Sequence, residues 1–323
     1  MKQNFWEKLK KPIIALAPMA GITDSAFRQI CKDFGADVVY SEMISVDGLH
    51  YKSKKTFELL KFSKKEKPFV VQLFGSKPEL FAEAAIHVEK LGADGVDINF
   101  GCPAPKIYKS GGGIKLMRDL SLCYEIIKAT CQAVKIPVSI KIRSSINVLN
   151  YKRKITALNL VRKIKNLPLS AIMIHGRSYE QGFGGEVDLQ MIKNVKENFK
   201  GIVLGNGGIV NPEKAKEMLD KTGVDGIGLA QGVLGNPWLF EQVKNYLKTG
   251  KYNEYNFSQI KKVALSHAQL CYKLKGKQGI LEMRKHLAWY ARGFEGASLL
   301  RQKLIKANNL NEIKKSLDSI EIK

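Results

Sequence analysis

Eight short runs rich in β-branched residues alternate with amphipathic stretches over about the first 240 residues of the chain. The runs span residues 13–17, 37–42, 69–74, 95–100, 138–143, 171–176, 202–206 and 226–230. Strand patterns that alternate with helical ones predict parallel strands joined by helices. Eight such units predict an α/β fold of the (β/α)8 type, the TIM barrel.

A doubly wound open sheet is the rival architecture for this pattern. The sequence that comes nearest to its dinucleotide-binding fingerprint is GIGLAQG, at the last expected strand. Its third glycine comes one residue late, and no acidic residue sits on a following strand. The sequence therefore favours the barrel.

The chain beyond the barrel has a purely helical pattern. Its apolar spacing is that of helices in residues 257–274, 281–294 and 297–317. This predicts a C-terminal all-α bundle of three or four helices, with a catalytic barrel over 1–245 and a helical domain over 246–323. From Asn245 onward the chain has 16 Lys or Arg and six Asp or Glu, and it is more than twice as basic per residue as the part before it.

The whole chain carries a net charge of +23, which favours a nucleic-acid partner. A lysine-rich composition is the plainer explanation, since 44 of the 53 basic residues are lysine. No apolar run reaches the roughly 18 residues of a membrane span, and the N-terminal one is too short for a signal peptide. We therefore expect a cytoplasmic protein with no membrane partner, and a monomer by default.

The five cysteines, Cys31, Cys102, Cys123, Cys131 and Cys271, show no C-x-x-C spacing. This argues against a zinc ribbon, an iron–sulfur cluster and a secreted disulfide framework, and we expect no metal. Cys102 differs from the other four, which fall inside expected helices. It follows a strand, between a glycine and a proline, and it could act as a general acid, as a thiolate nucleophile or as buried filler.

Polar residues stand at the carboxyl ends of the expected strands, where barrels collect their chemistry. They are Glu42, Gln72, Asn99, Lys141, Arg143, His175, Asn206 and Gln231. Lys141 calls for an anionic partner: a phosphate, a Schiff-base substrate or a reduced flavin. His175 could hydrogen-bond a cofactor or a carbonyl. The glycines of residues 205–209 and 228–236 favour a phosphate site, although tight turns without a ligand would also use them.

The segment 281–294 mixes cations with aromatic residues. On a helix, Lys285, Trp289 and Arg292 would share a face next to His286. This combination suits phosphate and base contacts in RNA. An amphipathic helix with Leu287, Trp289 and Tyr290 in its core is the alternative.

Several motifs, in this order, resemble the tRNA-dihydrouridine synthases. They are APMAGITDSAFR, VVQLFGS, DINFGCPAPKI, SIKIR, IHGR, GNGGI and GNPW, and the segment from Met283 to Leu304 is similar to the bacterial B-type subfamily. The resemblance implies an FMN-dependent barrel that reduces the C5=C6 bond of uridines in tRNA, with NADPH as reductant. It also implies that Cys102 protonates C5 and that Asn99 holds the uracil edge.

The resemblance further assigns cofactor and RNA contacts. For FMN these are Pro18, Met19, Ala20, Gln72, Lys141, His175, Asn206, Gly207, Gly208, Ala230 and Gln231. For RNA they are Asn99, Arg143, Arg177, Lys285, His286, Trp289 and Arg292. Gln231 departs from the family, which usually has arginine there, and glutamine cannot grip a phosphate bidentately. Weaker FMN binding, or a substitute cation, is therefore expected.

Two other functions fit parts of the sequence. A flavin barrel acting on a small molecule, such as dihydroorotate or an enone, would also use a phosphate site and an inward lysine, but it would need no basic helical domain. A non-catalytic RNA-binding protein would need the basic domain but not Cys102.

Overall fold

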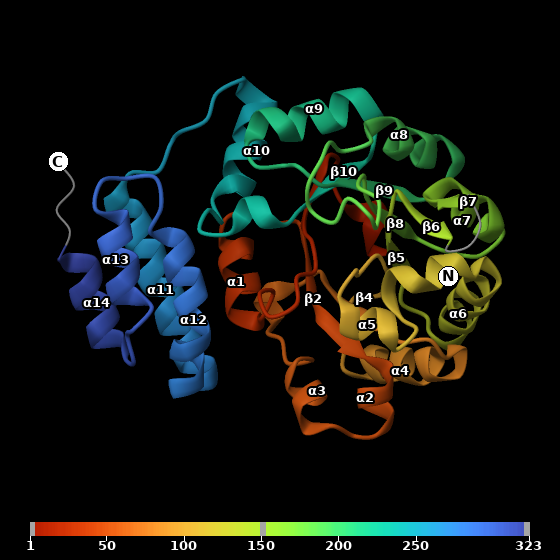
Figure 1. Cartoon of the computed structure of the whole chain (residues 1–323), viewed down its shortest axis with the longest axis horizontal. Helices are drawn as coiled ribbons and strands as arrows, with labels where there is room; N and C mark the ends of the chain where they lie inside the picture. Colours follow the sequence, from red (N-terminus) through yellow and green to blue (C-terminus); the bar gives the residue numbers. More distant parts are fainter. Residues whose placement is uncertain (1–3, 149–152, 320–323) are drawn as a thin grey trace.

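The structure is a computed structural model that describes residues 4–148 and 153–319, and it consists of a barrel and a helical domain beside it (Figure 1). The barrel strands are β1 (Ile13–Leu16), β2 (Val38–Ser45), β3 (Phe69–Phe74), β4 (Gly95–Phe100), β5 (Val138–Arg143), β8 (Ala171–His175), β9 (Ile202–Asn206) and β10 (Gly226–Leu229). They close in the order β1-β10-β9-β8-β5-β4-β3-β2, and all neighbours are parallel. This confirms the (β/α)8 barrel and all eight expected strands.

The strands are buried on both faces, as parallel strands covered by helices are. Alternate residues of β1 serve different cores, because successive side chains of a strand point to opposite faces. Ile14 and Leu16 pack in the cluster shared with the surrounding helices, whereas Ile13 and Ala15 pack inside the barrel. Trp6, in the 3₁₀ turn η1 (Phe5–Lys8), joins the inner cluster and is 1% exposed. It fills the end of the barrel where the strands begin.

Helices and 3₁₀ turns connect the strands. They are α1 (Ser25–Asp33), α2 (Val46–His50), α3 (Lys54–Glu58), η2 (Lys64–Glu66), α4 (Pro78–Lys90), α5 (Pro105–Lys109), η3 (Gly113–Arg118), α6 (Leu120–Ala133), α7 (Ala157–Ile164), α8 (Leu189–Asn198), α9 (Pro212–Thr222), η4 (Gln231–Val233) and α10 (Leu239–Thr249). Asp24 and Asn211 cap α1 and α9 by accepting backbone N–H groups, as side chains at helix starts do. Gly35 and Gly92 follow α1 and α4 with positive φ, the conformation that ends helices.

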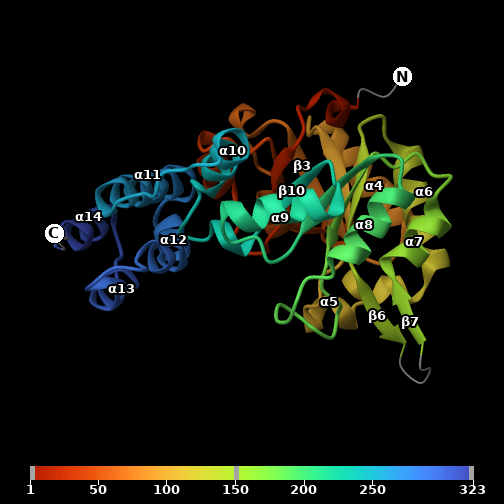
Figure 2. The same ribbon diagram turned by 90° about the horizontal axis from the view of Figure 1, so that it is seen from above.

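An antiparallel hairpin that the sequence did not reveal lies between β5 and α7. Its strands are β6 (Ser145–Val148) and β7 (Arg153–Thr156), paired from Ser145–Thr156 to Val148–Arg153. Each strand has only four residues, which is too short for an alternating pattern to stand out. Figure 2 shows the hairpin on the same side of the barrel as α5.

The helical domain contains α11 (Phe257–Lys275), α12 (Lys277–Tyr290), α13 (Ala297–Leu304) and α14 (Leu310–Asp318), which confirms the all-α bundle. Its core includes Ile280, Leu287 and Leu300, each fully buried. Helix α10 packs beside α9 in the barrel and continues to Thr249, so the expected boundary at 245/246 falls inside it.

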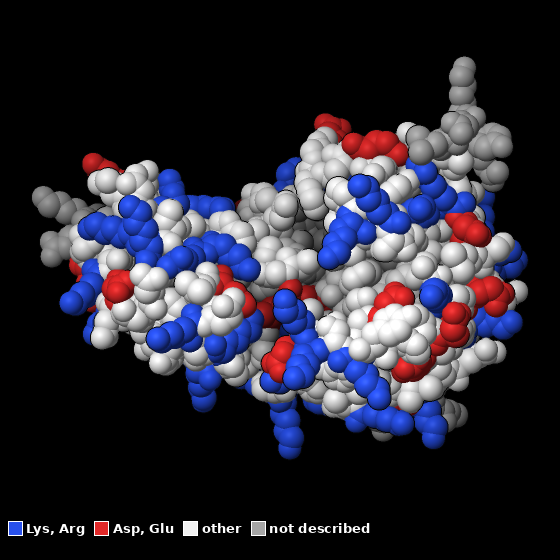
Figure 3. All heavy atoms as spheres, turned by 60° about the horizontal axis from the view of Figure 1, so that its bottom comes forward, with Lys and Arg blue, Asp and Glu red and all other residues white. Residues whose placement is uncertain are grey.

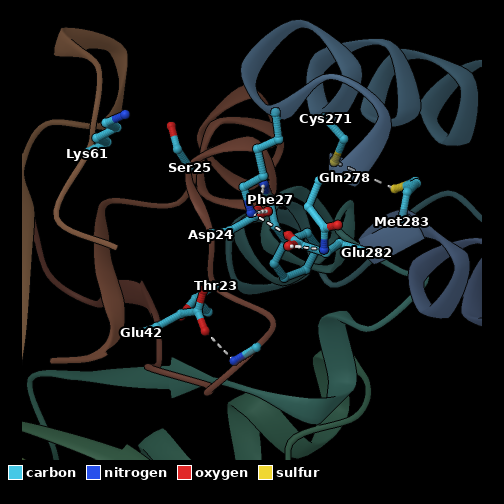
Figure 4. Close-up of polar contacts among 12 residues, drawn as sticks. Thr23, Asp24, Ser25, Phe27, Glu42, Lys61, Cys271, Gln278, Glu282 and Met283 are labelled. Atoms are coloured by element: carbon cyan, nitrogen blue, oxygen red, sulfur yellow. Dashed lines mark hydrogen bonds and ion pairs between the residues drawn. The ribbon is translucent and has the colours of Figure 1, made fainter. Parts of the chain in front are cut away.

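The two domains meet along α1 and the loop before it (Figures 1 and 4). Ala26 of α1 and Trp238 pack into the helical core. The Nζ atom of Lys275 donates to Asp24 Oδ2 at 2.7 Å and to Glu282 Oε2 at 2.6 Å. The helical domain is therefore joined to the barrel by apolar contact and by a charged bridge. Over the described ranges, no helix is long and apolar enough to cross a membrane.

Candidate active site

The strand ends bring the expected polar residues to one rim of the barrel. The strand register aligns Asn99 with Lys141 and Arg143 with His175, and it aligns His175 with Asn206. Because neighbouring strands of a sheet lie about 4.8 Å apart, this alignment sets the residues side by side at the carboxyl end. Four adjacent strands, β4, β5, β8 and β9, thus supply the centre of the site.

Lys141 and Asn206 are joined across the rim. Lys141 Nζ donates to Asn206 Oδ1 at 3.2 Å, and Asn206 Nδ2 donates to the carbonyl of Gly228 at 2.7 Å. Burial and the charge of the nearby Arg143 lower the pKa of Lys141 to about 8, although the charge of Asp97 acts to raise it. An ammonium group has three N–H donors. Within the described residues only one of them has a protein partner, so Lys141 can serve an anionic ligand.

His175 is held as a neutral imidazole. Burial, with the positive charges of Lys141, Arg143 and Arg177, lowers its pKa to about 2. A neutral imidazole donates one hydrogen bond and accepts another. Gly207 follows β9 with φ of 109°, and a Cβ atom there would lie 2.5 Å from His175 Cδ2. Only glycine fits, and the turn presents bare backbone beside the imidazole.

Cys102 lies two residues after β4, with its backbone fixed and its side chain half-buried. Its N–H donates to Asn99 Oδ1 at 2.8 Å, and its carbonyl accepts from Ile114 N–H at 3.1 Å. Burial raises the pKa of the thiol above its usual value, while the Ala104 N–H, Lys141 and Arg143 act in the opposite direction. Cys102 is therefore a protonated thiol at neutral pH, which favours a proton donor over a thiolate nucleophile.

A chain of buried polar groups runs from the barrel interior to Cys102. Ser139 Oγ and Gln72 Nε2 donate to the two oxygens of Asp97, at 2.6 and 2.7 Å. Asn99 Nδ2 donates to Gln72 Oε1 at 2.8 Å. The amide of Gln72 is fully buried and engaged on both ends, so its bond to a flavin stays a prediction.

Asp97 and Ser139 were missed by the sequence analysis. Both lie inside expected strands, two residues before Asn99 and Lys141, so alternation places each pair on one face. An acidic residue within an apolar strand was the available signal, because it needs partners when buried. Burial raises the pKa of Asp97 to about 6, despite the hydrogen bonds from Gln72 and Ser139.

The two arginines of the rim have different environments. The side chain of Arg143 is 2% exposed and donates to the carbonyls of Gly101, Ser178 and Gly182, at 3.0, 2.8 and 2.6 Å. Its guanidinium group holds two loops together in this structure through Nε and Nη1, and its expected contact with RNA stays a prediction. Arg177 is half-buried and donates from Nε to Gly185 at 2.9 Å.

The glycine turns lie where the sequence placed them. Gly207 and Gly208 have positive φ and line a cavity of about 410 Å³ with Arg177. Ala230 and Gln231 follow β10, and Gln231 is exposed. Because Arg177 lies beside Gly208, it can stand in for the missing arginine as a nearby cation.

The loop after β1 completes the rim. Pro18 and Met19 are half-buried and Ala20 is exposed. Gly21 donates its N–H to the carboxylate of Glu42, and its carbonyl accepts from Lys285 Nζ. The Glu42 contact is drawn in Figure 4. The helical domain thus contacts the loop that carries the expected flavin-lining residues.

The structure changes the setting of the expected RNA-binding helix face, whose contact with RNA stays a prediction. Helix α12 ends at Tyr290, so Arg292 is exposed in the following turn and shares no helical face with Lys285 and Trp289. His286 is 3% exposed and packs against Phe27 and His267, so in this structure it belongs to a buried cluster, and its contact with RNA stays a prediction. Trp289 is half-buried, and Lys285 contacts the barrel.

The closed barrel carries a thiol, a cation and a phosphate-type glycine turn on one rim, an arrangement that suits a flavin-dependent oxidoreductase. The family model for dihydrouridine synthases matches residues 15–323. The chain belongs to the dihydrouridine synthase family.

Named relatives agree with this family. A probable tRNA-dihydrouridine synthase 1 of Synechocystis sp. is 33% identical over 94% of this chain and 84% of that protein. A probable tRNA-dihydrouridine synthase of Rickettsia bellii is 37% identical over 89% of this chain and 88% of the relative. The tRNA-dihydrouridine synthase B of Pseudomonas aeruginosa is 34% identical over 89% of this chain and 86% of that protein. This confirms the likeness to the bacterial B type.

Solved structures share the fold at low sequence identity. Histamine dehydrogenase from Rhizobium sp. 4-9 aligns with a TM-score of 0.56 and 13% identity over 80% of this chain. The 6-hydroxypseudooxynicotine amine oxidase of Pseudomonas geniculata aligns with a TM-score of 0.53 and 16% identity over 73% of this chain. This chain spans about half the length of each, 48% and 47%, so the likeness concerns the barrel fold alone.

Proposed function

We propose that this chain reduces the C5=C6 bond of selected uridines in tRNA, as a cytoplasmic enzyme that uses FMN and NADPH. The observation that carries the proposal is the position of Cys102, a half-buried protonated thiol on the same rim as Lys141 and His175. The family of the chain supports the reaction, and the residues of the rim support the cofactor.

The residues of the rim fit a flavin phosphate and ring. The bare backbone at Gly207 and Gly208, next to Arg177, suits a phosphate. Lys141 has donors to spare and would place a positive charge beside the ring, where it stabilises the reduced form. Pro18 and Met19 offer half-buried apolar surface on the adjoining loop. FMN bound there would supply a hydride for C6 of the uracil, and NADPH would restore the electrons.

Cys102 would complete the reduction by giving its thiol proton to C5. One hydride and one proton then saturate the double bond, and the thiolate takes a proton back from solvent. The raised pKa of Cys102 keeps this proton in place at neutral pH until it is needed. Neutral His175 could hydrogen-bond a uracil carbonyl or the cofactor without adding a second charge.

Asn99 links the substrate role to the buried polar chain. Its Nδ2 group donates to Gln72 Oε1 and to Met43 Sδ, and its Oδ1 atom accepts from the backbone N–H groups of Gly101 and Cys102. To hold the uracil edge, Asn99 would have to exchange one of these bonds for the base. The target uridine must also be turned out of its stack to reach the rim, because a base within a helix cannot enter a barrel mouth.

The test removes the thiol and measures the two half-reactions separately. In Cys102→Ala, flavin reduction by NADPH should match the wild type, and dihydrouridine formation in unmodified tRNA should fall by at least about 100-fold, the usual contribution of a general acid. Cys271→Ala removes a buried cysteine of the helical domain and serves as the control.

Two results would contradict the proposal in different ways. A normal yield of dihydrouridine from Cys102→Ala would refute the proton-donor role. Wild-type protein that stays colourless after incubation with excess FMN would refute the flavin assignment, with Gln231 as the first residue to examine.

A further inference from the structure

The segment that carries Cys102 extends over residues 101–118 and is called here the Cys102 loop; it includes α5 and η3. Its base is held by two bonds: Cys102 N–H donates to the side-chain oxygen of Asn99 in β4, and Ile114 N–H donates to the carbonyl of Cys102. Within the loop, Gly112 N–H donates to the carbonyl of Ile107 at 3.1 Å. These bonds shape the loop but do not fix α5 to the rest of the barrel.

A pair of stacked tyrosines makes that connection. The ring of Tyr108, on α5, stacks on the ring of Tyr179 with centroids 5.3 Å apart and planes inclined by 17°. Tyr179 belongs to residues 176–188, the β8–α8 loop. Both tyrosines are half-buried, and Tyr179 N–H donates to the carbonyl of Ser145 at 2.9 Å. The β8–α8 loop is thereby anchored to the hairpin strand β6.

Cations of the Cys102 loop also lie against this pair. Lys115 Nζ is 5.6 Å, and Arg118 Cζ 5.5 Å, from the centroid of the Tyr108 ring. Arg118 donates to the carbonyl of Asn147 in β6 at 2.9 Å. Tyr108 therefore joins both short helical pieces of the Cys102 loop to the same support.

Arg143 ties the same two loops nearer the rim. Its guanidinium group bonds Gly101, at the start of the Cys102 loop, and Ser178 and Gly182 of the β8–α8 loop. The start of the Cys102 loop is thus fixed by Arg143, and η3 at its far end is held by Ile114 and Met117, which are fully buried in the barrel core. The tyrosine stack fixes α5, which lies between them. Loss of the stack should therefore free α5, while η3 stays packed in the barrel core.

We infer that Tyr108 and Tyr179 are positioning residues that hold the Cys102 loop against the β8–α8 loop, so that Cys102 stays over the rim. The role in catalysis rests on the proposed function, since it requires Cys102 to be the proton donor. The loop tie itself does not depend on the reaction and can be measured on the protein alone.

The primary test is hydrogen exchange of the loop in Tyr108→Ala and Tyr179→Ala. Loss of an aromatic stack should raise the open fraction of the loop between about two- and tenfold. We expect the amides of Ser110 and Gly112, which donate to the carbonyls of Lys106 and Ile107, to exchange about fivefold faster in both variants. Tyr108→Phe keeps the stack and should exchange like the wild type.

Tyr124→Ala is the matched control. Tyr124 is a half-buried tyrosine of α6, with Lys163 Nζ 5.9 Å from its ring centroid, and it stacks on no aromatic ring among the described residues. If the amide exchange rates rise by less than about 1.5-fold in Tyr108→Ala and Tyr179→Ala, the stack does not hold the Cys102 loop. An equal increase in Tyr124→Ala would also overturn the inference, because the effect would be general loosening.

The second readout is turnover on tRNA. We expect Tyr108→Ala to lower the rate of dihydrouridine formation about fivefold while flavin reduction by NADPH is unchanged, and Tyr108→Phe to restore the rate. Faster exchange with unchanged turnover would overturn the positioning role. If the wild-type protein forms no dihydrouridine, the proposed function fails. Amide hydrogen exchange alone then tests whether the two tyrosines hold the Cys102 loop in place.

Discussion

At the scale of single residues, the site is defined by groups whose protonation depends on burial. Cys102 keeps its proton, His175 is neutral and Lys141 is a cation close to losing its proton. Asp97 lies beneath them, and it is the acidic counterpart of Lys141 in the barrel interior. The charge of Lys141 acts on Cys102, His175 and Asp97, so a change in one of these groups should be visible in the pH dependence of the folded protein.

We expect Asp97→Asn to change how stability depends on pH. Burial raises the pKa of Asp97 from 3.8 to about 6, so the folded protein binds this proton more tightly than the unfolded chain does. Stability from this group is therefore lost as pH rises from about 4 to about 6. Relative to Asp97→Asn, the wild type should lose roughly 2 kcal/mol of unfolding free energy between about pH 4 and pH 7.

Urea denaturation at the two pH values measures this difference. Asp220→Asn, which alters an exposed carboxylate of α9, should show no comparable change. A constant difference between the wild type and Asp97→Asn across the range would mean that Asp97 titrates as it does in the unfolded chain.

At the scale of elements, the helical domain contacts the loop between β1 and α1. Lys275 of α11 bonds Asp24, which also caps α1, and Lys285 of α12 bonds Gly21 (Figure 4 shows the setting of Asp24). Burial alone would raise the pKa of Asp24, but the charge of Lys275 lowers it overall. Because this loop carries Pro18 and Met19, the helical domain supports one wall of the rim.

We predict that Lys275→Met lowers the stability of the whole chain. The side chain of Asp24 is 13% exposed, and it would lose its charged partner while remaining largely out of water. Losing a charge-assisted hydrogen bond at such a site costs roughly 1–3 kcal/mol. Urea denaturation should show this loss, and Lys273→Met, an exposed lysine of the same helix, should leave stability within about 0.5 kcal/mol of the wild type. Equal stabilities for the two variants would contradict the bridge.

At the scale of the whole molecule, Lys and Arg side chains are spread over both the barrel and the helical domain, with Asp and Glu among them. Figure 3 shows Lys and Arg side chains over the helical domain and over the neighbouring part of the barrel, on both sides of a hollow. The net charge of +23 supplies the long-range attraction for a polyanion, and the rim supplies the chemistry. A folded tRNA could contact both domains while one base enters the rim.

We expect Arg292→Ala to weaken tRNA binding and to reduce its dependence on salt. Arg292 is exposed, and removing one cation that neutralises a phosphate reduces the slope of log K against log salt by about one. Lys216→Ala, on α9 and paired with Asp220, is the control. Filter binding at several salt concentrations measures both. An unchanged slope in Arg292→Ala would exclude that arginine from the RNA interface. Lys285→Ala is a poorer probe, because Lys285 also holds Gly21.

The barrel and its rim were largely determined by the sequence. Short apolar runs rich in β-branched residues, spaced by amphipathic helices, leave few architectures, and the eight strands were found where they were expected. Cys102, Lys141, His175 and Asn206 could be placed together because parallel strands deliver their carboxyl ends to one rim. These inferences need only the order of residues along the chain and the geometry of a strand.

The tertiary structure alone decided which polar groups face one another and which are buried. The sequence could not reveal that Arg143 donates hydrogen bonds to three backbone carbonyls, or that His286 is buried. Nor could it reveal that Tyr108 stacks on Tyr179, because residues about 70 positions apart meet only when loops of different strands fold together. Side-chain pairings of this kind depend on distances in space, which the spacing of residues along the chain does not determine.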